Sequence, residues 1–135
     1  MSQSILVDSD ILIDHLRKEK HALAFLSSEI EKGSFLFVSV ISRIEILAGM
    51  RKGEEVAVGQ LFELLMPIPV DEAIADRAGD YLRKYCKSHG LNIGDAIIAA
   101  TAGEMSLNLA TLNVKHYCMK DIELLEAYKK GGGGD

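Results

Sequence analysis

Near its N-terminus the chain reads Ile5-Leu6-Val7-Asp8-Ser9-Asp10-Ile11-Leu12-Ile13-Asp14. Residues 5–7 are all apolar, which is typical of a short strand buried on both faces in a parallel sheet. The apolar residues after Asp10 recur at the spacing of a helix. Asp8 and Asp10 therefore lie where a buried strand ends and a helix begins, the usual ligand-binding edge of an open α/β sheet.

The composition is that of an ordinary globular protein. A chain of 135 residues, 48% hydrophobic and 26% charged, predicts one domain with a single core. The net charge of −5 argues against a general nucleic-acid coat protein but allows an enzyme with a local basic patch and metal ions. Without a basic leader or an apolar run of about 18 residues, we expect a cytoplasmic protein with no membrane contact. Cys86 and Cys118 lack paired spacing, so we expect reduced thiols.

Hydrophobic periodicity predicts alternating strands and helices along the chain. Strands are expected at 5–7, 35–38, 66–70 and 107–112, and helices at 10–18, 21–32, 42–50, 54–65, 71–88, 95–102 and 122–128. This order predicts a three-layer α/β/α fold whose central sheet is mainly parallel, with about four to five strands. Residues 1–128 should form the single domain, and residues 129–135, rich in lysine and glycine, a flexible tail of the kind that cloning adds.

Three carboxylates and an amide are expected at one edge of this sheet. Asp8 follows the first strand, and Glu45 lies in the first turn of the helix after the second. Asp95 opens the apolar helix before the last long strand, and Asn113 follows that strand. Such a cluster is unfavourable without a cation, because like charges raise one another's pKa. Oxygen ligands suit Mg²⁺ or Mn²⁺, and the chain has no His/Cys spacing for zinc.

Each acid also has a purely structural explanation. Ser42-x-x-Glu45 has the pattern of a capping box, and Asn92-x-x-Asp95 that of a weaker one. Asp8 or Asp10 could be a plain helix N-cap. A shared site is favoured because these acids interrupt the most hydrophobic stretches of the chain, where Ser or Thr would suffice as a cap.

Four segments, taken together, resemble a known family: Leu6–Ile13, Val40–Gly49, Asp95–Ala102 and Ala110–Tyr117. In this order and spacing they resemble the PIN domain, and most closely the VapC-type toxin ribonucleases of prokaryotic toxin–antitoxin pairs. The resemblance extends over residues 5–125. Each motif alone would be weak evidence, whereas the ordered set is highly specific.

The resemblance implies a metal-dependent endoribonuclease that hydrolyses RNA phosphodiester bonds. It implies that Asp8, Glu45 and Asp95 form a catalytic acidic triad that holds Mg²⁺ or Mn²⁺. It also implies a homodimer, and inhibition by a small cognate antitoxin whose tail enters the cleft. Such an ion can activate water for attack on the phosphodiester.

Two positions depart from the pattern of the family. Many members have a fourth acid where this chain has Asn113, and commonly Ser, Thr or Asn where it has Asp10. One hypothesis is that Asp10 partly replaces the missing charge, as a metal ligand or as a neighbour of one. The alternative is that Asp10 caps the first helix.

Basic residues near these motifs are candidates for contact with RNA. Arg43 is close to Glu45, and Lys115 and His116 follow Asn113. Solvated surface charge explains Arg43 and Lys115 equally well. His116 could polarise a leaving group, but a metal-dependent site does not require it.

Three other functions fit parts of the pattern. In a haloacid-dehalogenase-type phosphatase Asp8 would be the nucleophile, but Leu12 stands where Thr is expected and Asp95 lacks a second acid downstream. A receiver-type domain would place its acceptor Asp after a middle strand. A non-catalytic binding module with the PIN fold is distinguished by the absence of metal-dependent RNA cleavage.

Overall fold

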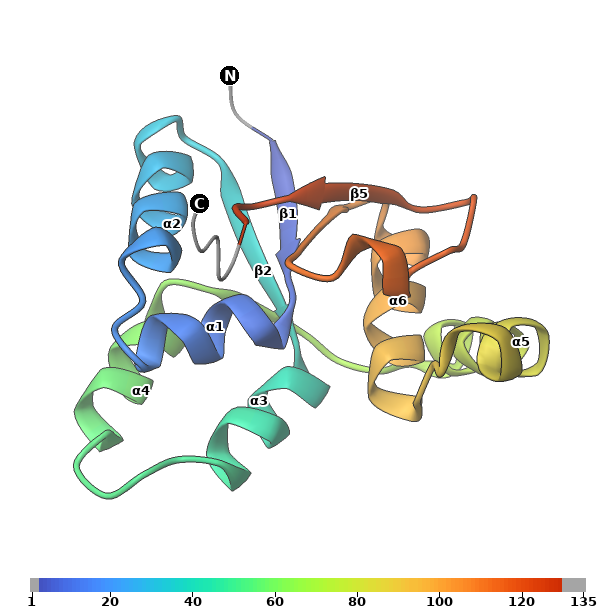
Figure 1. Ribbon diagram of the computed structural model, residues 1–135, viewed down its shortest axis with the longest axis horizontal. Coiled ribbons are helices and arrows are strands. Elements are labelled where there is room, and N and C mark those ends of the chain that lie inside the picture. Colours follow the sequence, from blue (N-terminus) through green and yellow to red (C-terminus); the bar gives the residue numbers. More distant parts are fainter. Residues whose placement is uncertain (1–2, 130–135) are drawn as a thin grey trace.

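The computed structural model describes residues 3–129, without the side chains of residues 86–89. Within this part of the chain one sheet has the strand order β3-β2-β1-β4-β5, and every neighbouring pair is parallel (Figure 1). Its strands are β1 (Ser4–Val7), β2 (Phe35–Ser39), β3 (Met66–Ile68), β4 (Asn108–Thr111) and β5 (Glu123–Glu126). The predicted tail at 129–135 lies, apart from Lys129, outside the described residues.

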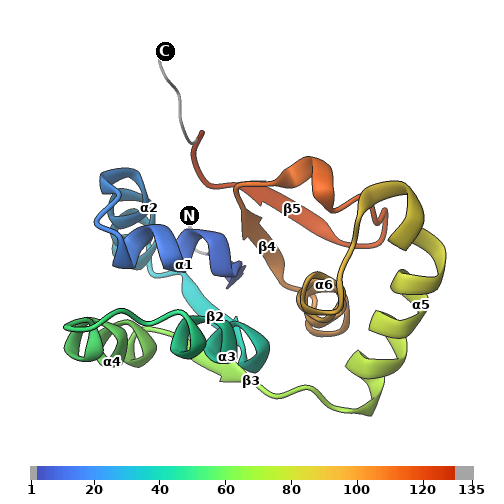
Figure 2. The ribbon, with the colours of Figure 1, turned by 60° about the horizontal axis from the view of Figure 1, so that its bottom comes forward.

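Helices cover both faces of the sheet, as Figure 2 shows. One face carries α1 (Ser9–Leu16), α2 (Lys20–Glu31), α3 (Val40–Ala48) and α4 (Glu55–Glu63). The other carries α5 (Glu72–His89) and α6 (Ile93–Met105), with the segment around the short 3₁₀ helix η1 (Val114–His116). The predicted three-layer α/β/α fold with a parallel central sheet is confirmed.

The central strand β1 separates two hydrophobic clusters. Ile5 and Val7 pack with the α1–α4 layer, whereas Leu6 packs with the α5–α6 layer. All three side chains are fully buried. The apolar run therefore reflects a strand covered on both faces, as expected for the middle of a parallel sheet.

The predicted helix at 122–128 is wrong, because this segment contains strand β5. Leu124 and Leu125 lie opposite Leu109 and Ala110 in a parallel ladder with β4. Without β5, the backbone N–H and C=O groups on that side of β4 would have no strand partner. Pairing along this edge outweighs the local helix preference of a short Glu- and Leu-rich segment.

The helix after β2 begins two residues earlier than predicted. Ser39, fully buried, is its N-cap, and its hydroxyl accepts a hydrogen bond from the Ile41 N–H (3.1 Å). Ser42 therefore lies inside the first turn and does not cap the helix, so the predicted Ser42–Glu45 capping box is wrong. Between residues 3 and 129, none of the helices is long and apolar enough to cross a membrane.

Candidate active site

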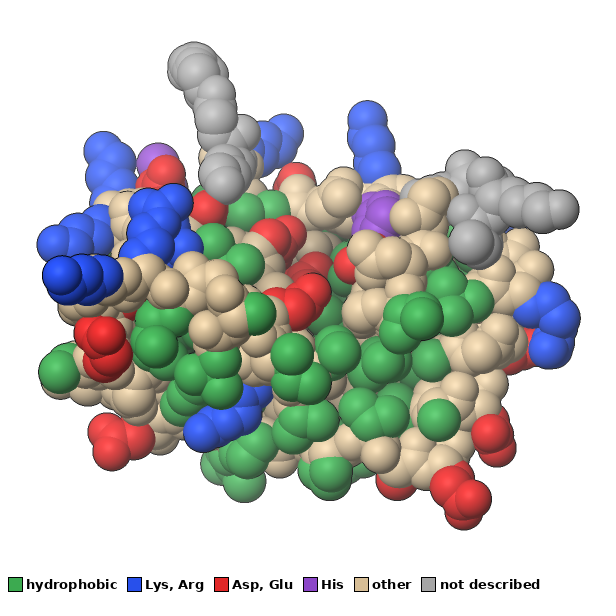
Figure 3. Space-filling view, turned by 90° about the horizontal axis from the view of Figure 1, so that it is seen from below, with side chains coloured by type: hydrophobic (Ala, Val, Ile, Leu, Met, Phe, Trp, Pro, Cys, Tyr) green, Lys and Arg blue, Asp and Glu red, His purple; other side chains and the backbone are tan. Residues whose placement is uncertain are grey.

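Acidic side chains gather around one cavity at the carboxyl edge of the sheet. The cavity has a volume of about 340 Å³. Figure 3 shows acidic side chains in the middle of this face, with a histidine nearby and hydrophobic side chains around them. The residues that line it are Asp8, Ser9, Asp10, Ile13, Glu45, Asn92, Asp95, Ile98, Asn113, His116 and Tyr117.

The structure therefore brings together the predicted triad with both additional candidates and His116. Asp8 is supplied by the end of β1, Glu45 by α3 and Asp95 by the first turn of α6. Among the described lining residues there are four carboxylates and neither Lys nor Arg. A cavity with this charge favours a cation over an anion.

Asp8 is the N-cap of α1 and has little contact with solvent. Its Oδ1 accepts a hydrogen bond from the Ser9 N–H (2.8 Å), and its Oδ2 accepts one each from the hydroxyls of Thr111 and Tyr117 (2.9 Å each). Burial is the largest cause that raises the pKa of Asp8, to about 6, and the nearby Asp10 carboxylate is the second. The hydrogen bonds act in the opposite direction and lower this pKa. The site thus contains a buried carboxylate whose charge is poorly compensated.

Asp10 joins the start of α1 to the end of β4. Its carboxylate accepts hydrogen bonds from the backbone N–H of Ile11 (2.7 Å) and of Leu112 (3.1 Å). Burial raises its pKa despite these donors. The alternative that Asp10 caps the first helix is wrong, because Asp8 occupies that position. Its role as a replacement charge stays a prediction.

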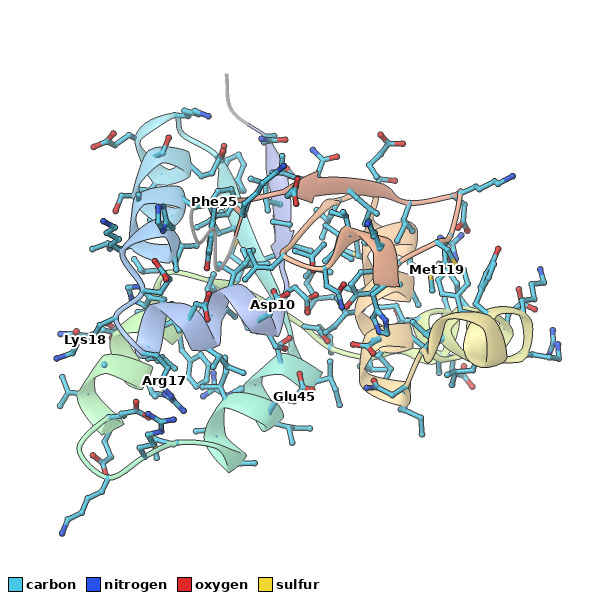
Figure 4. The ribbon with its side chains drawn as sticks, in the orientation of Figure 1. Asp10, Arg17, Lys18, Phe25, Glu45 and Met119 are labelled. Atoms are coloured by element: carbon cyan, nitrogen blue, oxygen red, sulfur yellow. The ribbon has the colours of Figure 1, made fainter. Side chains whose placement is uncertain are left out.

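Glu45 is linked to the N-terminus of α1 through two serines. The Ser9 hydroxyl lies 2.5 Å from the Glu45 carboxylate and 2.7 Å from the Ser42 hydroxyl. Since a hydroxyl has one proton, Ser9 donates to Glu45 and accepts from Ser42. Glu45 is in the second turn of α3, not the first as predicted. Figure 4 shows Asp10 on α1 and Glu45 on α3 lying towards the same space.

Asp95 is fixed by a capping box and by His116. The Asp95 N–H donates to the Asn92 side chain (2.8 Å) and the Asn92 N–H donates back to the Asp95 carboxylate (3.4 Å), so the predicted box is confirmed. The His116 Nε2 lies 2.6 Å from the Asp95 Oδ2. The predicted amide candidate, Asn113, follows β4, and its backbone N–H donates to the Thr111 hydroxyl (3.1 Å).

Two of the three predicted basic contacts, Arg43 and Lys115, lie outside the cavity lining. The Arg43 guanidinium stacks over the Phe62 ring, 4.2 Å from its centroid, and so faces α4. Lys115 is exposed on η1. Neither side chain is among the lining residues, and their contact with RNA stays a prediction.

Sequence reasoning missed three hydroxyl groups that hold the acids. Ser9, Thr111 and Tyr117 all lie within the motifs that resemble the family, but the chain alone did not show which acid each would contact. The available signal was the presence of polar residues in or beside buried strands. A buried hydroxyl must find a partner, and here the partner is a carboxylate.

The donor set fits a hard divalent cation. Six lining residues carry carboxylate or amide oxygens, and Mg²⁺ and Mn²⁺ prefer such ligands. As placed, however, the described residues include no group of three or more His, Cys, Asp or Glu that could hold a metal ion. Glu45 and Asp95 instead hydrogen-bond to Ser9 and His116. These contacts use the Glu45 Oε1 and the Asp95 Oδ2, so a cation would bind through the other oxygen of each carboxylate.

A family model and two relatives of known sequence match most of this chain. The family model described as "PIN domain" matches residues 5–121. Ribonuclease VapC10 of Mycobacterium tuberculosis is 47% identical over 116 residues, which are 85% of this chain and 86% of that protein. Ribonuclease VapC19 of the same organism is 38% identical over 115 residues, which are 84% of this chain and 92% of that protein.

Solved structures with the same fold include toxin–antitoxin complexes. A toxin-antitoxin complex from Klebsiella pneumoniae superposes with a TM-score of 0.74 and 25% identity, covering 93% of this chain and 98% of that chain. FitAcB from Neisseria gonorrhoeae superposes with a TM-score of 0.68 and 26% identity, covering 91% and 97%. The family model matches residues 5–121, which are most of the chain, and the chain therefore belongs to the PIN domain family.

Proposed function

We propose that this protein is a metal-dependent endoribonuclease and the toxin of a toxin–antitoxin pair, with residues 1–128 as its single domain and the cytoplasm as its place of action. The observation that carries the proposal is the cavity where Asp8, Glu45 and Asp95 converge from three elements. Two relatives at 47% and 38% identity are named ribonucleases, which supports RNA as the substrate. Membership of the PIN domain family argues against the phosphatase and receiver alternatives.

Asp8, Glu45 and Asp95 would hold Mg²⁺ or Mn²⁺, with Asp10 and Asn113 as further ligands or neighbours of ligands. When bound, such an ion lowers the pKa of a water molecule and neutralises charge on the phosphate. The protein's own contribution is orientation. Hydrogen bonds from neighbouring hydroxyl and imidazole groups restrict the rotation of all three acids.

His116, in the cavity wall, is the basic group best placed to contact the RNA phosphate. Lys115 is exposed one residue earlier and would add a charge at the rim. Arg43 would have to leave the Phe62 ring to reach RNA.

A small antitoxin is the proposed protein partner, and a homodimer the proposed assembly. The solved structures with this fold at 25% and 26% identity include a toxin-antitoxin complex and FitAcB. Large apolar side chains are exposed on α3 and at the start of α6, namely Ile44 (60%), Leu47 (47%) and Ile93 (67%). Exposed apolar surface of this kind is typical of protein–protein contacts.

Cleavage of RNA by the purified protein, with Mn²⁺ or Mg²⁺ and with EDTA, tests the proposal. Cleavage should require the metal and be lost in Asp8→Asn, Glu45→Gln and Asp95→Asn. The exposed acid Asp76 gives a matched control, and Asp76→Asn should cleave normally. Metal binding without cleavage in the wild type would contradict the proposal and favour the non-catalytic binding module.

A further inference from the structure

We infer that Tyr117 is a positioning residue, whose hydroxyl orients Asp8 for divalent-cation binding and whose ring joins the Asp8 half of the site to the Asp95 half. This inference rests on the proposed metal-dependent function. It concerns a residue that the acidic motif does not include.

The hydrogen-bond donors around Asp8 are distributed unevenly between its two oxygens. An ionised carboxylate has about four acceptor positions, two on each oxygen. Tyr117 and Thr111 both lie 2.9 Å from the same oxygen, Oδ2. The Thr111 hydroxyl is farther, 3.3 Å, from the Asp10 Oδ2, so its single proton goes to Asp8 and both positions on the Asp8 Oδ2 are used. Oδ1 accepts one hydrogen bond, from the Ser9 N–H. The open acceptor position on Asp8 is therefore on Oδ1, and rotation of the carboxylate would break the two hydroxyl contacts.

The Tyr117 ring is itself fixed by packing. Its side chain is 3% exposed and packs in the hydrophobic cluster of the α5–α6 layer. A ring held in this way cannot follow Asp8 if the carboxylate turns. The hydroxyl is therefore a fixed reference point for Asp8, rather than a mobile group that adapts to it.

Tyr117 also contacts His116. The two rings meet edge to face, with centroids 5.4 Å apart and planes at 78°. His116 in turn contacts Asp95 at 2.6 Å. Asp8, Tyr117, His116 and Asp95 thus form a continuous series of contacts from the end of β1 to the start of α6. One side chain therefore acts on two acids that are 87 residues apart in sequence.

Tyr117→Phe is the sharpest perturbation, because it removes the hydroxyl and keeps the ring. Tyr128→Phe is a matched control: the Tyr128 hydroxyl donates to the buried Asp14 carboxylate at the same distance, 2.9 Å, and neither residue lines the cavity. Both variants lose one tyrosine–aspartate hydrogen bond. Only Tyr117→Phe loses this hydrogen bond at the cavity.

The experiment measures the Mn²⁺ dissociation constant of the full chain without RNA, from the electron paramagnetic resonance signal of free Mn²⁺. Removal of a group that orients a metal ligand typically weakens metal affinity about 10–100-fold, so Tyr117→Phe should weaken Mn²⁺ binding at least about 10-fold. Tyr128→Phe should bind Mn²⁺ as the wild type does. Raised Mn²⁺ should restore RNA cleavage by Tyr117→Phe, but not by Asp8→Asn.

Three results would overturn the inference. Wild-type Mn²⁺ affinity in Tyr117→Phe would exclude a positioning role, and equal weakening in both tyrosine variants would indicate general loosening of the fold. A wild-type protein that neither binds Mn²⁺ nor cleaves RNA would overturn the proposed function as well. If Tyr117→Phe does not fold by circular dichroism, Thr111→Val removes the other hydroxyl on the Asp8 Oδ2, together with its contacts to Asp10 and Asn113, and should weaken Mn²⁺ binding. Thr111→Ser keeps the hydroxyl and should bind Mn²⁺ as the wild type does, and wild-type affinity in Thr111→Val would overturn the inference.

Discussion

Asp8→Asn should change how the stability of the metal-free protein depends on pH. Asp8 is 7% exposed, and burial, followed by repulsion from Asp10, raises its pKa from 3.8 to about 6. Between these values the folded state keeps a proton that the unfolded chain has lost. Stability from Asp8 is therefore greatest at low pH and is lost as the pH rises towards and through the folded-state pKa of about 6.

The magnitude follows from the two pKa values. At 1.36 kcal/mol per pH unit, the interval from 3.8 to about 6 corresponds to about 3 kcal/mol in the free energy of unfolding. At pH 4 the unfolded chain is already more than half ionised at this position. About 2 kcal/mol of the loss therefore falls between pH 4 and pH 7.

Urea unfolding of the wild type and of Asp8→Asn, in EDTA at several pH values from 4 to 7, measures this quantity. The asparagine has one acceptor oxygen in place of two, so it loses part of the Asp8 hydrogen-bond set, but this cost is nearly independent of pH. The stability of the wild type relative to the variant should fall by about 2 kcal/mol as the pH rises from 4 to 7. Saturating Mn²⁺ should reduce that fall in the wild type, because a bound cation compensates the charge.

Asp80→Asn is a control with the opposite sign. The hydrogen bond from Lys84 lowers the pKa of Asp80, so its contribution to stability is present at neutral pH and lost as the pH falls. Relative to this variant, the wild type should lose stability only as the pH falls below the usual Asp pKa of 3.8, and should show no fall between pH 4 and pH 7. Parallel curves for the wild type and Asp8→Asn over the whole range would refute the reasoning, since the Asp8 charge would then cost nothing in the folded state.

Four further predictions concern the fold and can be checked by urea unfolding. A Cβ at Gly103 would lie 1.9 Å from the Arg77 Nη1, so the Arg77 side chain, which is paired with Glu104, would have to move. Gly103→Ala should therefore stabilise the protein by about 1 kcal/mol in an Arg77→Ala background and by less in the wild type; equal effects in both backgrounds would contradict this. Leu6→Ala should cost about 2–5 kcal/mol because its side chain is fully buried. Leu47→Ala, at a side chain 47% exposed, should stay within about 0.5 kcal/mol of the wild type. Ser39→Ala should cost about 1 kcal/mol through loss of the α3 N-cap, and an unchanged stability would mean that another residue caps the helix.

Features that depend on a few neighbouring residues could be predicted from the sequence. The apolar run at 5–7 required a strand covered on both faces, and the Asn92–Asp95 spacing required a capping box. Convergence of Asp8, Glu45 and Asp95 followed from one topological rule, that parallel strands end at the same edge. These features hold in the structure because local backbone preference and the overall fold agree.

Tertiary structure alone decided the last strand and the capping serine of α3. Residues 123–126 form β5 because the edge of β4 offers backbone partners, which a local pattern cannot show. Ser39 caps α3 and Ser42 is left to hydrogen-bond Ser9, because the helix begins where strand β2 ends in the sheet.

The sequence by itself determined which acids meet at the cavity, and only the tertiary structure decided what holds them. Asp8 receives hydroxyls from Thr111 and Tyr117, which are 103 and 109 residues away in the chain. Partners at such separations depend on strand order and on the path of the segment after β4, not on local preference. The physical reason is that a buried carboxylate takes its hydrogen bonds from whichever donors the packed layers bring within about 3 Å.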